Sequence, residues 1–151
     1  MKNNNWIFFI ILACIAVLGG CDAAASRHDA GEVASLFYES QKDSSEKIPQ
    51  ELFVDEQIGM ETENQLNRRE MAYGAFISRD RIAVNRQISL KGRERKETFT
   101  YVFEVLCEHG RTRETLMMSR ERSAVPFLIT AYVIEDIPRI DNSLPEETIS
   151  I

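Results

Sequence analysis

The chain has 151 residues, of which 44% are hydrophobic, and its 18 basic and 24 acidic side chains give a formal net charge of −6. Residues 1–20 have the composition of a leader, and the 131 residues that remain suffice for one domain with its own hydrophobic core. This length excludes tandem domains and a multi-span membrane protein. The negative charge argues against general nucleic-acid binding.

The leader has the pattern of a secretory signal peptide. A short polar start with Lys2 precedes an unbroken apolar run over residues 6–18. This run of 13 residues is shorter than the roughly 20 that a membrane-spanning helix needs. We therefore expect residues 1–20 to direct export and then to be removed.

The leader ends in Leu18-Gly19-Gly20-Cys21, which resembles the lipobox of bacterial lipoproteins. The resemblance implies cleavage between Gly20 and Cys21 by signal peptidase II, and attachment of membrane lipid to Cys21. Asp22 resembles the sorting signal that retains such proteins in the inner membrane, with the domain in the periplasm. The alternatives are the outer membrane, and an ordinary secreted protein in which the cysteine is accidental.

The first half of the exported chain is predicted to be helical. Residues 21–28 are expected to form a lipidated tether, and the domain to span residues 29–136. Asp29 and Glu32 fit a capping box, so a helix is predicted to start at Asp29, with an apolar stripe of Val33, Leu36, Phe37 and Ser40, flanked by Ala34 and Tyr38. Pro49 suits the start of a short second helix. A third segment over about residues 55–73 is polar but rich in helix formers, and Gly74 is expected to stop it.

The hydrophobic period then changes to two, which predicts strands over residues 81–90, 98–108, 111–120 and 127–134. His109-Gly110 fits the two-residue loop of a hairpin. The fourth strand is apolar on both faces, which predicts a central or strongly curved position. Residues 137–151 are expected to form a flexible acidic tail. Together these elements predict an α+β domain, with N-terminal helices packed on a curved four-stranded antiparallel sheet.

A further resemblance covers about 100 residues, carried by residues 36–40, 73–74, 78–79, 101–105, 112–115 and 129–134. These segments resemble the nuclear transport factor 2-like, or cystatin-like, cone fold of small uncharacterised bacterial lipoproteins. The region from residue 43 to 58 departs most from that pattern. The resemblance implies a cavity at the open end of a cone, and some members of this fold dimerise through the open sheet face. In the enzymes among them, an Asp, His or Tyr in the cavity performs acid–base chemistry.

A hairpin loop at His109-Gly110 would place Glu114 opposite Val105, on the sheet face that meets the helices. A carboxylate on an apolar face must find a partner or take up a proton. Arg86 interrupts the apolar face of the first strand in the same way. The candidate cavity residues are therefore Arg86, Tyr101, Cys107 and Glu114. The alternative is a bulge or register shift that leaves both charged residues in solvent.

No catalytic set or cofactor motif stands out in the sequence. His28 in the tether and His109 at a hairpin tip are both expected to be exposed. Two distant histidines and one thiol in the exported chain do not make a metal site, and no phosphate-binding loop is present. Cys107 is interpreted as a small core residue without a disulfide partner.

Basic residues concentrate in the middle of the chain, where residues 79–122 hold 11 basic and 7 acidic side chains. The candidate docking surface for an acidic protein or anionic lipid is Arg93, Arg95, Lys96, Arg111, Arg113, Arg120 and Arg122. The alternative is a solvated sheet face with salt bridges.

These features predict a membrane-anchored periplasmic lipoprotein that acts as a non-catalytic binding or accessory module, with an envelope protein as partner. The first alternative is a carrier or sensor of a small ligand in the cone cavity. The second is an enzyme of the dehydratase or isomerase kind. A homodimer is compatible with all three.

Overall fold

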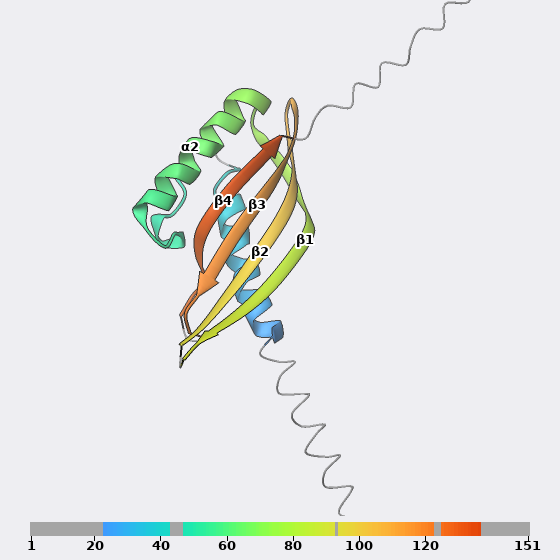
Figure 1. The fold of residues 1–151 in the computed structure, drawn as a ribbon. Coiled ribbons are helices and arrows are strands. Elements are labelled where there is room, and N and C mark those ends of the chain that lie inside the picture. Colours follow the sequence, from blue (N-terminus) through green and yellow to red (C-terminus); the bar gives the residue numbers. More distant parts are fainter. Residues whose placement is uncertain (1–22, 43–46, 93, 123–124, 137–151) are drawn as a thin grey trace, which may run out of the picture.

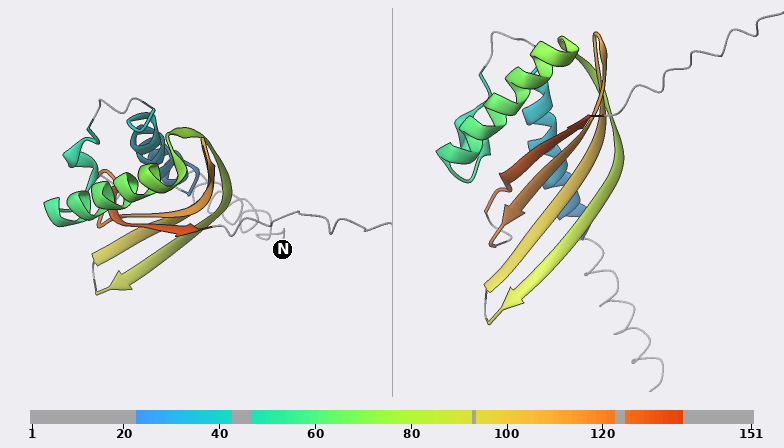
Figure 2. Two further views of the ribbon diagram at one scale, coloured as in Figure 1. Left: turned by 90° about the horizontal axis from the view of Figure 1, so that it is seen from above. Right: turned by 45° about the horizontal axis from the view of Figure 1, so that its top comes forward.

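The structure is a computed structural model that describes residues 23–42, 47–92, 94–122 and 125–136. Its elements are a helix over residues 23–39, η1 (Gln50–Leu52), α2 (Glu56–Tyr73), β1 (Phe76–Lys91), β2 (Glu94–Cys107), β3 (Gly110–Arg120) and β4 (Leu128–Asp136). The strands form one antiparallel sheet in the order β1-β2-β3-β4. Both helices cover the same face of the curved sheet (Figures 1 and 2). The predicted α+β class is confirmed.

The helix over residues 23–39, called the N-terminal helix below, is already formed at residue 23. The predicted start at Asp29 and its capping box are therefore wrong, because Asp29 lies inside the helix. Residues 23–28, assigned to a tether, are helical, and residues 21 and 22 lie outside the described residues. Three alanines at residues 23–25 favour this extension, since alanine has the highest helix propensity.

The buried face of the N-terminal helix consists of Ser26, Ala30, Ala34, Phe37 and Tyr38. This spacing of three and four residues is that of one helix face. The predicted apolar stripe differs from this buried face at Leu36, which is 57% exposed. Small side chains near the start of the helix let it approach the sheet closely there, and the aromatic side chains fill the wider space further along.

The helix α2 covers the third predicted segment and ends before Gly74 as predicted. The carboxylate of Asp55 accepts a hydrogen bond from the backbone N–H of Ile58 at 2.9 Å, which caps α2. Gly74 ends it with φ 79°, a conformation that glycine adopts without a steric penalty. The short helix after Pro49 is also confirmed, as the single 3-10 turn η1. No helix among the described residues is both long and apolar enough to cross a membrane.

The core lies between the helices and the alternating face of β2 and β3. The side chains of β2 on this face are Phe99, Tyr101, Phe103, Val105 and Cys107, as predicted. β1 is longer than expected and contains two register irregularities. One of them lies between Arg81 and Ala83, so Ile82 leaves the face that it was predicted to share with Val84.

β4 is an edge strand and not a central one. Another part of the chain covers its outer edge near Ile129, whereas Val133 on its other face is 46% exposed. Phe53 forms a parallel bridge with Ile129, and the N–H of Val54 donates to the carbonyl of Ile129 at 3.0 Å. By contrast, no described segment pairs with the outer edge of β1.

The β2–β3 hairpin turns at Glu108-His109, not at His109-Gly110. Gly110 instead pairs with Cys107 inside the sheet, and a Cβ atom there would lie 2.7 Å from the ring of Tyr73. The glycine is therefore explained by close packing and not by the turn. The register is displaced by two residues from the prediction.

Candidate functional site

A buried carboxylate lies at the centre of the interface between the helices and the sheet. Glu114 is fully buried on β3, opposite Phe103 and on the predicted face. It accepts hydrogen bonds from Tyr38 at 3.0 Å, Tyr132 at 2.5 Å, Thr112 at 3.0 Å and Arg69 at 2.9 Å. Glu114 and these four residues are called the Glu114 network below. The four donors come from the N-terminal helix, α2, β3 and β4. This carboxylate therefore joins all the layers of the domain.

Arg69, the ion-pair partner of Glu114, was not predicted from the sequence. It lies on α2 in line with Thr62 and Leu66, which is the spacing of the helix face turned toward the sheet. Only 5% of Arg69 is exposed. Burial is the largest single effect and lowers its pKa, but Glu114, Tyr132 and Cys107 together outweigh burial, so the pKa is raised. The sequence does contain a signal for this role, because the helical spacing places Arg69 on the same face as the few apolar residues of α2.

The four candidate cavity residues do not form one site. Glu114 and Cys107 lie near Arg69, and burial raises the pKa of the Cys107 thiol. Tyr101 donates to the backbone carbonyl of Arg27 at 3.2 Å. Arg86 belongs to a different group of charges, so the predicted cavity is divided into separate regions.

That second group, called the Glu97 network, lies where β1, β2 and β3 meet the start of the N-terminal helix. Glu97 is buried and accepts from Arg86 at 2.5 Å and from Arg120 at 3.1 Å. Arg120 also donates to Asp29 at 3.0 Å and to Ser26 at 2.6 Å. Asp29 therefore binds an arginine of the sheet instead of capping a helix.

The predicted docking residues are also dispersed. Arg120 is buried, and Arg93 lies outside the described residues. Arg95 and Lys96 lie at the start of β2, whereas Arg111 and Arg113 lie at the opposite end of the sheet. Arg111 is paired with Glu104 at 2.7 Å, and Arg113 and Arg122 are exposed. These side chains do not make one continuous surface.

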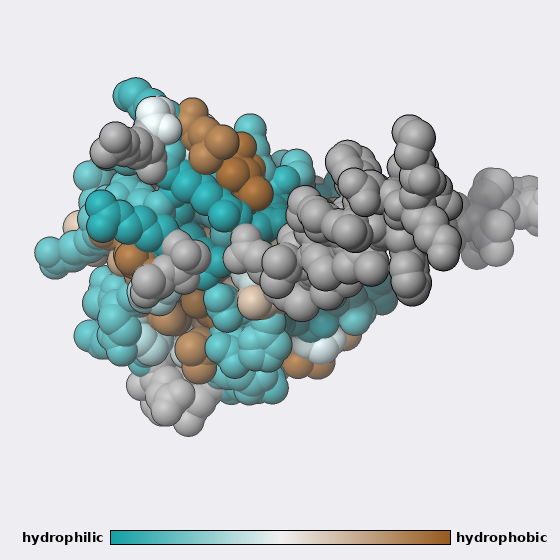
Figure 3. All heavy atoms as spheres, turned by 90° about the horizontal axis from the view of Figure 1, so that it is seen from below, coloured by the Kyte–Doolittle hydropathy of each residue, from teal (hydrophilic) through white to brown (hydrophobic). Residues whose placement is uncertain are grey.

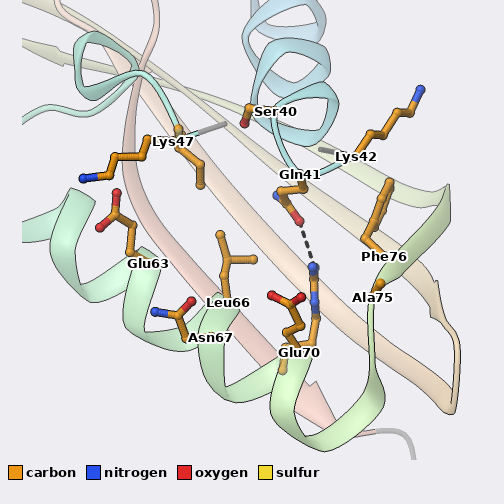
Figure 4. A pocket seen from close by; sticks show the side chains of 12 residues that line it. Ser40, Gln41, Lys42, Lys47, Glu63, Leu66, Asn67, Glu70, Ala75 and Phe76 are labelled. Carbon is orange, nitrogen blue, oxygen red and sulfur yellow. Dashed lines mark hydrogen bonds between the residues drawn. The ribbon is translucent and has the colours of Figure 1, made fainter. Parts of the chain in front are cut away.

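A hollow of about 280 Å³ opens between the end of the N-terminal helix, the segment before η1 and α2 (Figure 4). Its charged lining is mixed: Lys47 lies beside Glu63, and Glu70 lies further along, whereas Lys42 points away from the hollow and is paired with Glu39 at 2.8 Å. Arg69 also lines it and donates to Gln41 at 2.9 Å, the dashed bond in Figure 4. The Nε atom of Arg69 has no hydrogen-bond partner among the described residues. This hollow could hold a small polar molecule.

A second candidate is the groove between the N-terminal helix and β1, called the arginine groove. Its polar and aromatic lining includes three arginines and one carboxylate: Arg27, Glu32, Ser35, Arg79, Arg81 and Tyr101. The guanidinium of Arg79 lies 4.4 Å from the ring centre of Tyr38, and that of Arg81 lies 5.6 Å from that of Tyr101. The hollow directly between these side chains has a volume of about 220 Å³. Two arginines are thus held over aromatic rings at the floor of an open groove.

These arginines lack acidic partners. No described carboxylate lies within 4.0 Å of the guanidinium groups of Arg27, Arg79 or Arg81. Burial lowers the pKa of Arg79, and Arg81 adds to this effect by repulsion, whereas Tyr38 and Glu39 oppose it. Glu39 acts on Arg79 without forming an ion pair with it, so a bound anion would reduce the remaining cost of burying this cation. The groove is therefore suited to an anionic partner.

The tyrosines of the Glu114 network predict that the domain loses stability at alkaline pH. Burial, and then the charge of Glu114, raise the pKa values of Tyr38 and Tyr132 well above 10.0. Because their pKa is higher in the folded state than in the unfolded chain, their contribution to the free energy of unfolding is fully present below pH 10. It declines as the pH rises above 10. In a titration followed by phenolate absorbance, we expect these two tyrosines to ionise only as the domain unfolds. Ionisation of all four tyrosines of the chain near pH 10 without unfolding would contradict this.

The fold and these sites define a small α+β domain with two buried charge networks and an open basic groove. Comparison of the chain with known protein families, curated proteins and solved structures finds no match. No three acidic, histidine or cysteine side chains among the described residues are placed to hold a metal ion. The lipobox and cone-fold resemblances therefore stay predictions.

Proposed function

We propose that the protein is a lipid-anchored lipoprotein of the bacterial inner membrane, with the outer membrane as the alternative, and that it is a non-catalytic binding or accessory module. Its domain lies in the periplasm and docks an acidic segment of an envelope protein in the arginine groove. Two features support this: the sequence Leu18-Gly19-Gly20-Cys21, and the arginines without acidic partners.

The observation that carries the docking proposal is the placement of Arg79 and Arg81 over aromatic rings, with no described carboxylate within 4.0 Å. The chain as a whole has a net charge of −6, so this groove is a local reversal of sign. Such a reversal attracts a complementary partner and fixes its orientation. The aromatic floor adds apolar contact area to the ionic attraction.

The test is crosslinking in intact cells, followed by affinity purification of the full-length protein. The informative variant is Arg79→Gln with Arg81→Gln, which removes two charges from the groove. The matched control is Arg111→Gln with Arg113→Gln, which removes the same charge at exposed positions elsewhere. We expect one reproducible envelope partner, and capture reduced roughly tenfold or more by the groove variant alone. Equal capture by all three proteins would contradict docking in the groove.

A second candidate function is the carriage or sensing of a small polar ligand in the hollow beside Arg69. The observation in its favour is the Nε atom of Arg69, which is buried without a partner among the described residues. An acceptor group on a ligand would satisfy it. This function predicts that Lys47→Ala with Asn67→Ala weakens the binding of small carboxylates, measured by the shift in melting temperature, and that the groove variant does not.

The dehydratase or isomerase alternative finds less support at the candidate cavity residue Glu114. A general base must be within reach of the proton that it removes. Glu114 is fully buried and already accepts four hydrogen bonds. We assign it to the stability of the domain.

A further inference from the structure

The start of the N-terminal helix and the β1–β2 hairpin lie at the same end of the molecule (Figures 1 and 2). Ala23 lines a hollow together with Val84 and Arg86 of β1. Leu90 follows Arg86 by four residues, or about 13 Å along a strand. Cys21 precedes Ala23 by two residues, which span at most about 7 Å. A lipid on Cys21 would therefore hold this hairpin within reach of the bilayer.

The side chains at this end of β1 and β2 include exposed apolar and basic ones, beside the exposed carboxylate of Glu94. Ile88 and Leu90 are 44% and 73% exposed and share the sheet face of Arg86, further along the strand than the hollow lined by Ala23. Lys91 and Lys96 are exposed and alternate onto the other face. Figure 3, which views the molecule from this end, shows exposed apolar surface among hydrophilic side chains.

This combination suits the interface of a membrane. Apolar side chains enter the boundary between head groups and acyl chains, and the long stems of lysines carry their charges to the lipid phosphates. Each basic side chain near an anionic surface adds to the attraction. The nearness of this end to the proposed anchor at Cys21 favours a lipid surface over a protein as the partner of Ile88 and Leu90.

We propose that the β1–β2 hairpin contacts an anionic phospholipid surface through Ile88, Leu90, Lys91 and Lys96. This inference rests on the proposed lipid anchor at Cys21. The anchor holds the chain at one point, and the hairpin supplies a second point of contact, so the domain has one orientation on the membrane. The arginine groove is not part of this contact.

The test uses the full-length acylated protein with Leu90→Cys labelled by an environment-sensitive fluorophore. The control carries the same label at Met71→Cys, on the last turns of α2, where the side chain is 81% exposed. Cys107 is buried and so protected from the label. Each protein is mixed with vesicles of phosphatidylcholine, either alone or with phosphatidylglycerol. Flotation reports the anchor, and quenching of the fluorophore by iodide reports the contact.

We expect both proteins to float, and quenching at position 90 to fall several-fold on phosphatidylglycerol vesicles while quenching at position 71 does not change. Unchanged quenching at position 90 in floating protein would overturn the contact and leave the anchor intact. Equal protection on phosphatidylcholine alone would overturn the role of anionic lipid. Protection without vesicles would show that protein covers the hairpin, which also overturns the inference. Failure to float would overturn the anchor and, with it, this inference.

Discussion

Replacing Glu114 with glutamine is expected to reduce the free energy of unfolding by about 3–5 kcal/mol, because it leaves the buried guanidinium of Arg69 without its counter-charge. Arg69 and Glu114 are 4% and 0% exposed at their side chains, so water does not take over the lost interaction. For a domain of this size, the loss corresponds to a fall in melting temperature of roughly 10–20 °C. The measurement is reversible urea unfolding followed by circular dichroism.

Two controls separate the charge from the hydrogen bonds. Tyr38→Phe removes one of the four donors to Glu114 and is expected to cost about 1–2 kcal/mol. Arg69→Met combined with Glu114→Gln removes both charges and is expected to recover part of the stability lost in Glu114→Gln alone. A loss below about 0.5 kcal/mol in Glu114→Gln would show that the ion pair contributes little to the fold.

Glu97→Gln is expected to have the second largest effect, a loss of about 2–3 kcal/mol. Glu97 compensates the charges of both Arg86 and Arg120, and its own side chain is 4% exposed. The loss is smaller than for Glu114 for two reasons: Arg86 is 26% exposed at its side chain, and Arg120 keeps its bond to Asp29. Urea unfolding of the variant checks the value, and Asp29→Asn, at a half-exposed carboxylate, should cost less.

The two networks share no residue, so their effects should add. The double variant Glu97→Gln with Glu114→Gln is expected to lose the sum of the two single losses, within about 0.5 kcal/mol. A marked deviation would mean that the networks are coupled through the aromatic row of β2 that separates them.

The face of Glu114 was predictable from the sequence, whereas its partner was not. Alternation along a strand places Glu114 on the buried face whether it lies opposite Val105, as predicted, or Phe103, as observed, because a displacement of two residues preserves the face. Arg69 approaches from a helix more than forty residues earlier in the chain. Such a contact is set by the packing of α2 on the sheet, which periodicity within one segment does not encode.

Local signals predicted the ends of α2 well, because Asp55 and Gly74 act on their own neighbours. They failed at the start of the N-terminal helix, where an alanine-rich segment suits a tether and a helix equally. The hairpin loop was misplaced because Gly110 was attributed to the turn, although close contact with Tyr73 explains it. The first failure is an ambiguity of the local sequence, and the second is due to a tertiary contact.

The arginines of the arginine groove were not predicted, although Tyr101, which also lines it, was a candidate cavity residue. Arg79 and Arg81 alternate on β1 with polar and apolar neighbours and show no motif. Their relation to the rings of Tyr38 and Tyr101 depends on the register of β1 with β2 and on the place of the N-terminal helix. Of the predicted docking residues, those that the structure describes lie at opposite ends of the sheet or in the interior.

The claim that the chain is a lipid-anchored module is tested most directly by the mass of the protein isolated from bacterial membranes. The account predicts that residues 1–20 are absent, that Cys21 is the first residue and carries acyl chains, and that Cys21→Ala abolishes both the acylation and the membrane association. A mature protein without lipid on Cys21, recovered in the soluble fraction, would contradict the anchor and the functions proposed from it.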